Sequence, residues 1–413
     1  MAKNETSESS TPTYSAEVLA QAKKQLEIIR RGVEEIIPEA ELFEKLCKSL
    51  STAKPLRVKL GVDPTRPDLH LGHTVVMQKL KDFQDCGHQV IFLIGDFTAQ
   101  IGDPSGRSET RKPLSKDEIK VNAKTYADQA LKILNPSKTQ IVFNSQWCDK
   151  LSITDVIKLS SQMTVARMIE RDDFSKRYGA KEPIALHEFL YPIMQAYDSV
   201  QLRSDVELGG TDQKFNVLLG RDYQKVAGQD PQVVIMMPIL EGLDGKLKMS
   251  KSYDNYIGVT EDAGTIFGKV MSISDQLMAR YYVLLTQENM DDVAAMHPKA
   301  AKVKLAKILV ERFHGAEAAD KAAEDFESVF AKGQIPEDTA EITLESKATS
   351  VVQVIVDNGL APSMTEARRL ISQGAVTING EKVGDIHAQF KQAGEALMKV
   401  GKRRFLKIKI QGH

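Results

Sequence analysis

Two histidines and a glycine stand where the sequence predicts the start of a helix. His70 and His73 flank Gly72 in the motif LHLGH (69–73), and apolar residues at helical spacing follow in TVVMQKLKDFQ (74–84). A helix N-terminus attracts phosphate groups, and imidazoles there can donate hydrogen bonds to phosphate oxygens. Gly72 would let a flat base or a phosphate approach the backbone. The motif therefore indicates a mononucleotide site, although so short a motif also recurs by chance.

A lysine-rich turn carries the second set of residues suited to phosphate chemistry. Lys246, Lys248 and Lys251 lie in GKLKMSKSYDN (245–255), a glycine-flanked segment predicted to be a flexible loop. Lysines on such a loop can close over a triphosphate and neutralise the charge that grows as pyrophosphate leaves. A lysine cluster by itself is more often a solvated surface turn. Together with the histidine motif, however, it favours a nucleotide site that the two motifs share.

The elements expected to position these motifs alternate between strands and helices. Four short apolar runs rich in branched residues are predicted strands: LRVKLGV (56–62), QVIFLIGDF (89–97), TQIVFNS (139–145) and QVVIMMPIL (232–240). Helical patterns separate them, and this βαβ rhythm is typical of a Rossmann-like doubly wound parallel sheet of the α/β class. Ligands bind such sheets beyond the carboxyl ends of the strands. The histidine motif lies where the first strand gives way to its helix.

Changes of pattern divide the chain into five segments. They are a disordered polar tail (1–14), a Rossmann-like catalytic domain with an N-terminal helical region (15–247), an α-helical domain that starts with the lysine turn (248–336), a polar linker (337–349) and a small α+β domain (350–413). The last segment is predicted to hold two helices and a hairpin, whose Asn379-Gly380 pair favours a type I′ turn. From Val351 onward, ten Lys or Arg residues stand against five Asp or Glu residues, so this end of the chain is locally basic.

Composition and charge exclude several classes of protein. A net charge of −1 over the whole chain argues against a generally basic nucleic-acid binder. The three cysteines, Cys47, Cys86 and Cys148, are far apart, which argues against a disulfide framework or a cysteine-rich zinc site and fits a reducing cytoplasm. The polar N-terminal tail lacks the apolar core of a signal peptide or a membrane span.

The two motifs resemble the signature sequences of class I aminoacyl-tRNA synthetases, HLGH and KMSKS in this chain. Three further stretches resemble the corresponding segments of bacterial tyrosyl-tRNA synthetases: IGDPSGR (101–107), YPIMQAYDSV (191–200) and GGTDQKFN (209–216). The C-terminal stretch SMTEARRLISQGAVTINGEKV (363–383) resembles the small RNA-binding fold named after ribosomal protein S-four. The resemblance implies activation of L-tyrosine by ATP to tyrosyl-adenylate and pyrophosphate, followed by transfer of the tyrosyl group to the 3′-terminal ribose of tRNA(Tyr).

The resemblance also assigns roles to individual residues. Contacts with the ATP phosphates in the transition state fall to Thr65, His70, His73, Lys248 and Lys251. Further ATP contacts fall to Gly61, Asp63, Gly72, Asp212, Met249 and Ser250. The tyrosine-binding residues are Asp103, Tyr191 and Gln195 for the ammonium group, Gln213 for the region of the carboxyl group, and Asp198 as acceptor of the phenol hydrogen bond. Arg368 and Arg369 would contact RNA phosphates.

The phenol contact is expected to control specificity. Asp198 would lose its partner if phenylalanine entered the site, and a buried polar group left unpaired is costly, so no editing domain is needed; tyrosyl enzymes are the usual example of this principle. One position departs from the best-known branch of the family, in which a tyrosine shares the phenol, because this chain has Lys59 there. Either Lys59 changes the pocket, or another group supplies the second phenol contact.

The resemblance implies the remaining ligands and partners. ATP is a substrate, Mg²⁺ is expected to travel on its phosphates, and neither zinc nor an organic cofactor is expected. Members of this family are homodimers, and a cytoplasmic enzyme without membrane contact is expected. Three rival hypotheses remain: a tryptophanyl enzyme, a nucleotidyltransferase with an HxGH loop, and a non-enzymatic RNA-binding protein. Asp198 and the basic C-terminal segment favour the tyrosyl enzyme over all three.

Overall fold

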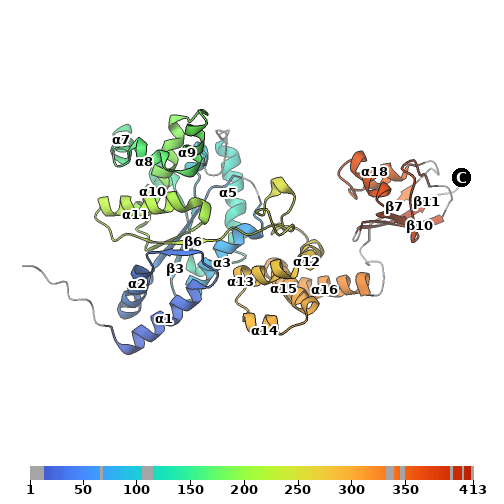
Figure 1. Cartoon of the computed structure of the whole chain (residues 1–413), viewed down its shortest axis with the longest axis horizontal. Helices are drawn as coiled ribbons and strands as arrows, with labels where there is room; N and C mark the ends of the chain where they lie inside the picture. The colour runs from blue at the N-terminus through green and yellow to red at the C-terminus, as the bar shows by residue number, and fades with distance from the viewer. Residues whose placement is uncertain are drawn as a thin grey trace, which may run out of the picture. The chain divides into compact units, whose positions relative to one another are not determined.

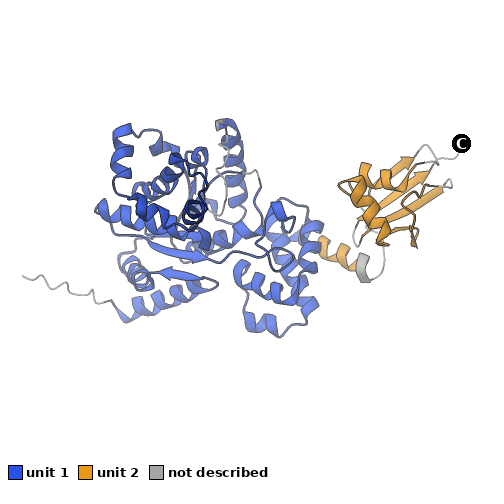
Figure 2. Ribbon diagram, turned by 45° about the horizontal axis from the view of Figure 1, so that its top comes forward, with its two compact units in different colours: residues 1–320 blue, residues 321–413 orange. Residues whose placement is uncertain are grey.

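The computed structural model of the chain describes residues 14–65, 68–104, 115–331, 339–344, 349–390, 394–401 and 404–410. The predicted disordered tail therefore lies outside the described residues, except for Tyr14, as does the end of the IGDPSGR stretch. The chain divides into two compact units, Met1–Asp320 and Lys321–His413, which are shown in different colours in Figure 2.

The first unit is built on a six-stranded sheet with the strand order β1-β6-β5-β2-β3-β4. Its strands are β1 (Glu35–Ile37), β2 (Arg57–Val62), β3 (Gln89–Ile94), β4 (Thr139–Phe143), β5 (Val206–Gly210) and β6 (Val233–Met237). All neighbouring strands are parallel except β1, which pairs antiparallel with β6. The four predicted strands and the doubly wound sheet are confirmed. The sequence prediction missed β1, which lies in a segment that was expected to be helical. It also missed β5, because the sequence VELGG has too few apolar residues to indicate a buried strand.

Helices surround this sheet, with α10 and α11 on one side and α1 and α2 on the other in Figure 1. Those before β4 are α1 (Ala16–Arg30), α2 (Glu39–Thr52), α3 (Leu71–Asp85), α4 (Thr98–Ile101) and α5 (Lys116–Ala130). Those between β4 and β6 are α6 (Ser145–Cys148), α7 (Ile153–Ser160), α8 (Val165–Ile169), α9 (Asp172–Gly179), α10 (Leu190–Leu202) and α11 (Lys214–Val226). Because both faces are covered, the central strands are almost entirely buried, as the continuous apolar sequence of β3 requires.

A buried ion pair fixes α3, the helix that begins at the histidine motif. The Lys79 ammonium lies 2.7 Å from a carboxylate oxygen of Asp82, and it donates hydrogen bonds to the backbone carbonyls of Arg31 (2.8 Å) and Ile28 (3.2 Å). Asp82 also accepts a hydrogen bond from Gln287, which follows α13. Since a buried charge is costly to leave unpaired, these contacts hold α3 against the N-terminal helix and the helical block that follows the sheet.

The helical block after the lysine turn confirms the change to helices that the sequence predicts. It contains α12 (Ala263–Ser272), α13 (Asp275–Leu285), α14 (Met290–Ala294), α15 (Pro298–His314) and α16 (Ala316–Ala331), the last of which crosses the boundary between the units. Within the described part of the chain, none of the helices has the length and apolar character needed to cross a membrane.

The second unit contains a five-stranded sheet with the order β7-β11-β10-β8-β9. Its elements are β7 (Glu341–Leu344), α17 (Val351–Asp357), α18 (Met364–Ser372), β8 (Val376–Ile378), β9 (Glu381–Lys382), β10 (Gly394–Val400) and β11 (Arg404–Ile410). Asn379 and Gly380 both have positive φ, 50° and 87°, as a type I′ turn requires. The predicted linker is wrong over Glu341–Leu344, because this segment pairs in parallel with β11 and packs Ile342 and Leu344 against the core.

Candidate active site

A cavity of about 450 Å³ opens at the carboxyl ends of β2 and β5 in the first unit. Its volume falls within the roughly 300–1,000 Å³ that is usual for small-molecule sites, and its place is the one that a doubly wound sheet predicts. The lining brings together the following predicted residues: Gly61, Asp63, Thr65, His70, Gly72, His73, Asp103, Tyr191, Gln195, Asp198, Asp212, Gln213, Lys248, Met249 and Ser250. Lys251 is the predicted residue of this unit that does not line it.

His70 and His73 cap the start of α3, and this capping determines which ring nitrogen can act as a donor. His70 is the N-cap residue of α3, and its Nδ1 accepts a hydrogen bond from the backbone N–H of Gly72 at 3.2 Å. The Nδ1 of His73 accepts in turn from the backbone N–H of His70 at 3.2 Å. A neutral imidazole whose Nδ1 accepts carries its proton on Nε2. Both rings are therefore set to donate from Nε2, which is the group that a phosphate oxygen needs.

Gly72 is required by this arrangement as well as by the ligand. A Cβ atom at this position would lie 2.9 Å from two atoms of the His70 ring, so any other residue would displace the capping imidazole. Part of the His73 side chain faces the open cavity, yet the protein packed around it and the nearby Lys251 charge lower the pKa of its imidazole. His73 is therefore neutral at physiological pH and acts as a hydrogen-bond donor rather than as a cation.

The lysine turn is anchored to the edge of the cavity by backbone contacts. Met249 N–H donates to the Leu240 carbonyl at 2.8 Å, and Ser250 N–H donates to the Asn255 side chain at 2.8 Å. Lys248 is close enough to Asp212 for its charge to lower the pKa of that carboxyl, which burial raises overall. This segment thus carries Lys248, Met249 and Ser250 along the cavity wall.

Lys251 points elsewhere in this structure. Its ammonium lies 3.2 Å from a carboxylate oxygen of Asp68 and 5.7 Å from the centroid of the Tyr256 ring. It therefore has to leave Asp68 before it can contact a phosphate, as the predicted loop closure would require.

Three predicted residues offer oxygen atoms suited to an ammonium group. The Tyr191 hydroxyl is hydrogen-bonded to Asp63, and burial together with Asp63 and Asp103 raises its pKa well above the usual value, so it stays protonated. The Asp103 carboxylate accepts a hydrogen bond from Gln213 at 2.9 Å. The buried Oε1 of Gln195 has no hydrogen-bond partner among the described residues, and it lines the same cavity. An acceptor held without a partner in a polar cavity is suited to a cationic ligand.

Asp198 is a buried acceptor, as the sequence predicts. Its side chain is 2% exposed, and it accepts hydrogen bonds from the Trp147 indole N–H (2.8 Å) and the Asn144 amide (3.2 Å). Burial raises the pKa of its carboxyl to about 7, whereas the Lys59 charge and the two hydrogen bonds act in the opposite direction. Trp147 packs against a core cluster, and its bond to Asp198 also makes it part of the site.

Glu207 is a residue of the site that the sequence analysis missed. It stands beside Lys59 in the register of β5 on β2, and its carboxylate oxygen lies 3.0 Å from the Lys59 ammonium. Both residues line the cavity and are buried. The available signal was an acidic residue in one strand, Glu207, next to a lysine in the neighbouring strand, Lys59. It could not be used because β5 itself was not predicted.

The hydrogen bonds between side chains around the cavity were also not predicted. The Thr98 hydroxyl donates to Asp63 at 2.8 Å and accepts from Asn144 at 3.1 Å. These bonds connect Asp63 with the residues around Asp198 through tertiary contacts that no sequence motif encodes. Arg368 and Arg369 belong to the second unit, where both are exposed on α18 and Arg369 lies 2.6 Å from Glu366.

Comparisons with known proteins agree with this geometry. The family model of "tRNA synthetases class I (W and Y)" matches residues 51–331, and that of the "Tyrosine--tRNA ligase SYY-like C-terminal domain" matches residues 331–406. The chain belongs to the class I tyrosyl-tRNA synthetases. A tyrosine–tRNA ligase of Carboxydothermus hydrogenoformans is 55% identical over 94% of this chain and 98% of its own length. One of Bordetella parapertussis is 50% identical over 96% of this chain and 99% of its own length.

Solved tyrosyl-tRNA synthetases share the fold of this family member. A C-terminally truncated mitochondrial enzyme of Aspergillus nidulans matches with a TM-score of 0.66 at 21% identity, over 76% of this chain and 98% of that one. An Archaeoglobus fulgidus enzyme, solved in complex with L-tyrosine, matches with a TM-score of 0.59 at 26% identity, over 73% of this chain and 99% of that one. The matched C-terminal domain and the named relatives favour the tyrosyl over the tryptophanyl enzymes and exclude the other two rivals.

The raised pKa of Asp198 predicts how tyrosine affinity depends on pH. Because the carboxylate is the form that accepts a phenol proton, affinity for tyrosine should rise with pH through about 7 and then level off. Below the pKa, each pH unit should weaken binding by up to about tenfold. Calorimetric titration of the protein with tyrosine at pH 6, 7 and 8 measures this dependence. The Asp198→Asn variant should bind tyrosine more weakly, and its affinity should not change with pH in the same way. An unchanged pH dependence in that variant would assign the titration to another group.

Proposed function

We propose that the chain activates L-tyrosine with ATP and passes the tyrosyl group to tRNA(Tyr) at this cavity. The observation that carries the proposal is that one cavity is lined both by a buried hydroxyl acceptor, Asp198, and by two Nε2 donors at the start of α3. Asp198 suits the hydroxyl group of tyrosine, and the two Nε2 donors suit the phosphates of ATP. Membership of the tyrosyl family supports the same assignment.

In the activation step, a carboxylate oxygen of tyrosine attacks the α-phosphorus of ATP. A new P–O bond forms as the bond to the pyrophosphate oxygen breaks, so negative charge builds up on the leaving group. His70, His73 and Lys248 stabilise this charge, with Thr65 beside them and Lys251 after the loop has closed. Mg²⁺ would be held mainly by the ATP phosphates, whose oxygen atoms are the ligands it prefers.

The other lining residues position the two substrates. Asp103, Tyr191 and Gln195 hold the tyrosine ammonium group through charge and oxygen acceptors. Gln213, already fixed by its bond to Asp103, contacts the carboxyl region, and Asp212 contacts the ribose of the nucleotide. The remaining ATP contacts come from Gly61, Asp63, Gly72, Met249 and Ser250. Holding both reactants in one orientation accounts for much of the rate enhancement.

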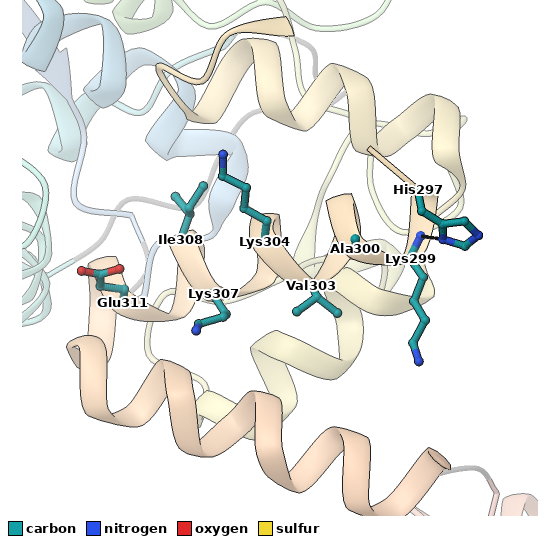
Figure 3. A pocket seen from close by; sticks show the side chains of 8 residues that line it. All are labelled: His297, Lys299, Ala300, Val303, Lys304, Lys307, Ile308 and Glu311. Atoms are coloured by element: carbon teal, nitrogen blue, oxygen red, sulfur yellow. Dashed lines mark hydrogen bonds between the residues drawn. The ribbon is translucent and has the colours of Figure 1, made fainter. Parts of the chain in front are cut away.

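In the second step, a hydroxyl of the 3′-terminal ribose takes the tyrosyl group and AMP leaves. We assign contacts with the tRNA backbone to Arg368 and Arg369 on α18 and to the lysine-bearing groove along α15 (Figure 3). In that groove Lys307 pairs with Asp320 at 2.5 Å and Lys304 pairs with Glu288, whereas Lys299 extends outward in the picture. Such contacts fix register on RNA without reading its sequence. We also propose that the reaction takes place in the cytoplasm.

The activation step is tested by amino-acid-dependent exchange of labelled pyrophosphate into ATP. With Mg²⁺ and each of the twenty amino acids in turn, the intact protein should show exchange with tyrosine alone. Asp198→Ala should lose most of it, whereas Asp85→Ala, which removes an exposed partner of Lys81, should keep it. Exchange with a different amino acid would contradict the pocket assignment, and absence of exchange with all twenty would contradict the proposed function.

We also propose that two copies of the chain associate through an apolar surface on α7, α8 and the turn before α10. Ile153, Ile157, Val165 and Leu186 are 82%, 63%, 62% and 83% exposed, and Ile153 and Ile157 share a face of α7 because they are four residues apart. Ile153 and Ile157 thus give α7 an exposed apolar face of the kind found at protein interfaces. A two-fold pair would bury the same surface on both copies.

Sedimentation measures this association directly. The protein should sediment at twice the 45.8 kDa of one chain, and Ile157→Glu should shift it towards the single chain because a charge would then face the interface. Val121→Glu provides the matched control, since Val121 is 66% exposed on α5 and lies outside the proposed surface. A single-chain mass for the unmodified protein would overturn the dimer.

A further inference from the structure

A buried lysine lies on the wall of the substrate cavity, close to Asp198. The Lys59 side chain is 0% exposed, and that of Glu207 is 1% exposed. The Lys59 ammonium donates to the Ser199 hydroxyl at 2.7 Å, and that hydroxyl donates to Glu207 at 3.0 Å. The ammonium is therefore held by a hydrogen bond and an ion pair at a fixed position in the wall.

The cost of this arrangement suggests that it has a function. A buried ion pair often contributes no more stability than a well-packed apolar pair of the same size. Here the pair also lines a polar cavity, and the Lys59 charge is the strongest of the influences that lower the pKa of Asp198. Lys59 thus acts electrostatically on the residue that receives the phenol.

The phenol group needs a donor in addition to an acceptor. Its hydroxyl can donate one hydrogen bond and accept others, and an ionised Asp198 can only accept. The N–H groups of Trp147 and Asn144 are already directed at Asp198, and the Thr98 hydroxyl donates to Asp63. An ammonium group has three N–H donors, of which Ser199 and Glu207 account for two. The third is therefore suited to the phenol oxygen.

We propose that Lys59 is the second contact of the tyrosine hydroxyl. Its ammonium donates to the phenol oxygen while the phenol donates to Asp198, and Glu207 with Ser199 keeps the ammonium in place. The proposal rests on the proposed function, since it deepens the tyrosine site. It also explains why this chain has Lys59 where the best-known branch of the family has a tyrosine. The Lys59 ammonium, held by the buried Glu207 carboxylate, then makes the phenol contact that the tyrosine makes in that branch. Phenylalanine would leave both Lys59 and Asp198 without their ligand partner.

The test compares two variants that differ in the ammonium group. Lys59→Met alone would leave Glu207 as an unpaired buried charge, so the informative variant is Lys59→Met combined with Glu207→Gln, and Glu207→Gln alone is the matched control. Pyrophosphate exchange gives kcat/KM for tyrosine and for phenylalanine. In the double variant the value for tyrosine should fall about 10- to 100-fold, with the value for phenylalanine and the KM for ATP unchanged. Glu207→Gln removes the ion pair but keeps the ammonium and its hydrogen bond to Ser199, so its tyrosine-to-phenylalanine ratio should fall less than that of the double variant.

A parallel fall for tyrosine and phenylalanine would show that Lys59 only supports the fold, and it would overturn the inference while leaving tyrosine activation intact. Failure of the unmodified protein to activate tyrosine would instead remove the proposed function. Fluorescence of Trp147, the only tryptophan in the chain, reports whether the variants fold.

A substrate analogue tests the same contact without any variant. The amino group of 4-aminophenylalanine can donate to Asp198, but it is a poor acceptor from an ammonium group. Its kcat/KM with the unmodified protein should therefore lie well below that of tyrosine, although it keeps the bond to Asp198. A value near that of tyrosine would overturn the Lys59 contact.

Discussion

The cavity depends on one requirement, that the buried carboxylate of Asp198 has donors around it. Trp147 and Asn144 supply two hydrogen bonds, and Lys59 supplies a charge. Without them the pKa of the carboxyl group would rise further, because burial alone favours the protonated form. With them, it remains available to a hydroxyl group that comes from the ligand.

The fold meets this requirement while placing phosphate donors in the same cavity. Parallel strands β2 and β5 bring Lys59 and Glu207 side by side, and β2 leads towards the start of α3 with its two capping histidines. The buried Lys79–Asp82 pair then fixes that helix to its neighbours. Specificity for the amino acid and stabilisation of the leaving pyrophosphate thus depend on elements adjacent in the sheet.

Much of the site was predictable because its signals are local. The capping histidines, the lysine turn and the Asn379-Gly380 turn are short segments whose residue types suffice to predict their structure. Glu207, β5 and the Thr98–Asn144 hydrogen bond were not predictable, because they depend on which strands pair and in which register. β7 was missed for the same reason: four residues of a polar stretch become a strand only through pairing with β11. The ion pair of Lys251 with Asp68 likewise depends on a tertiary contact.

A crystal structure of the protein with L-tyrosine bound would test the central claim most directly, namely that a hydroxyl-recognising site at Asp198 and Lys59 selects the substrate. The account predicts that the phenol oxygen lies about 2.6–3.2 Å from both the Asp198 carboxylate and the Lys59 ammonium, with the substrate ammonium group against Asp103 and Gln195. A phenol oxygen that contacts neither Asp198 nor Lys59, or a ring bound outside this cavity, would contradict it.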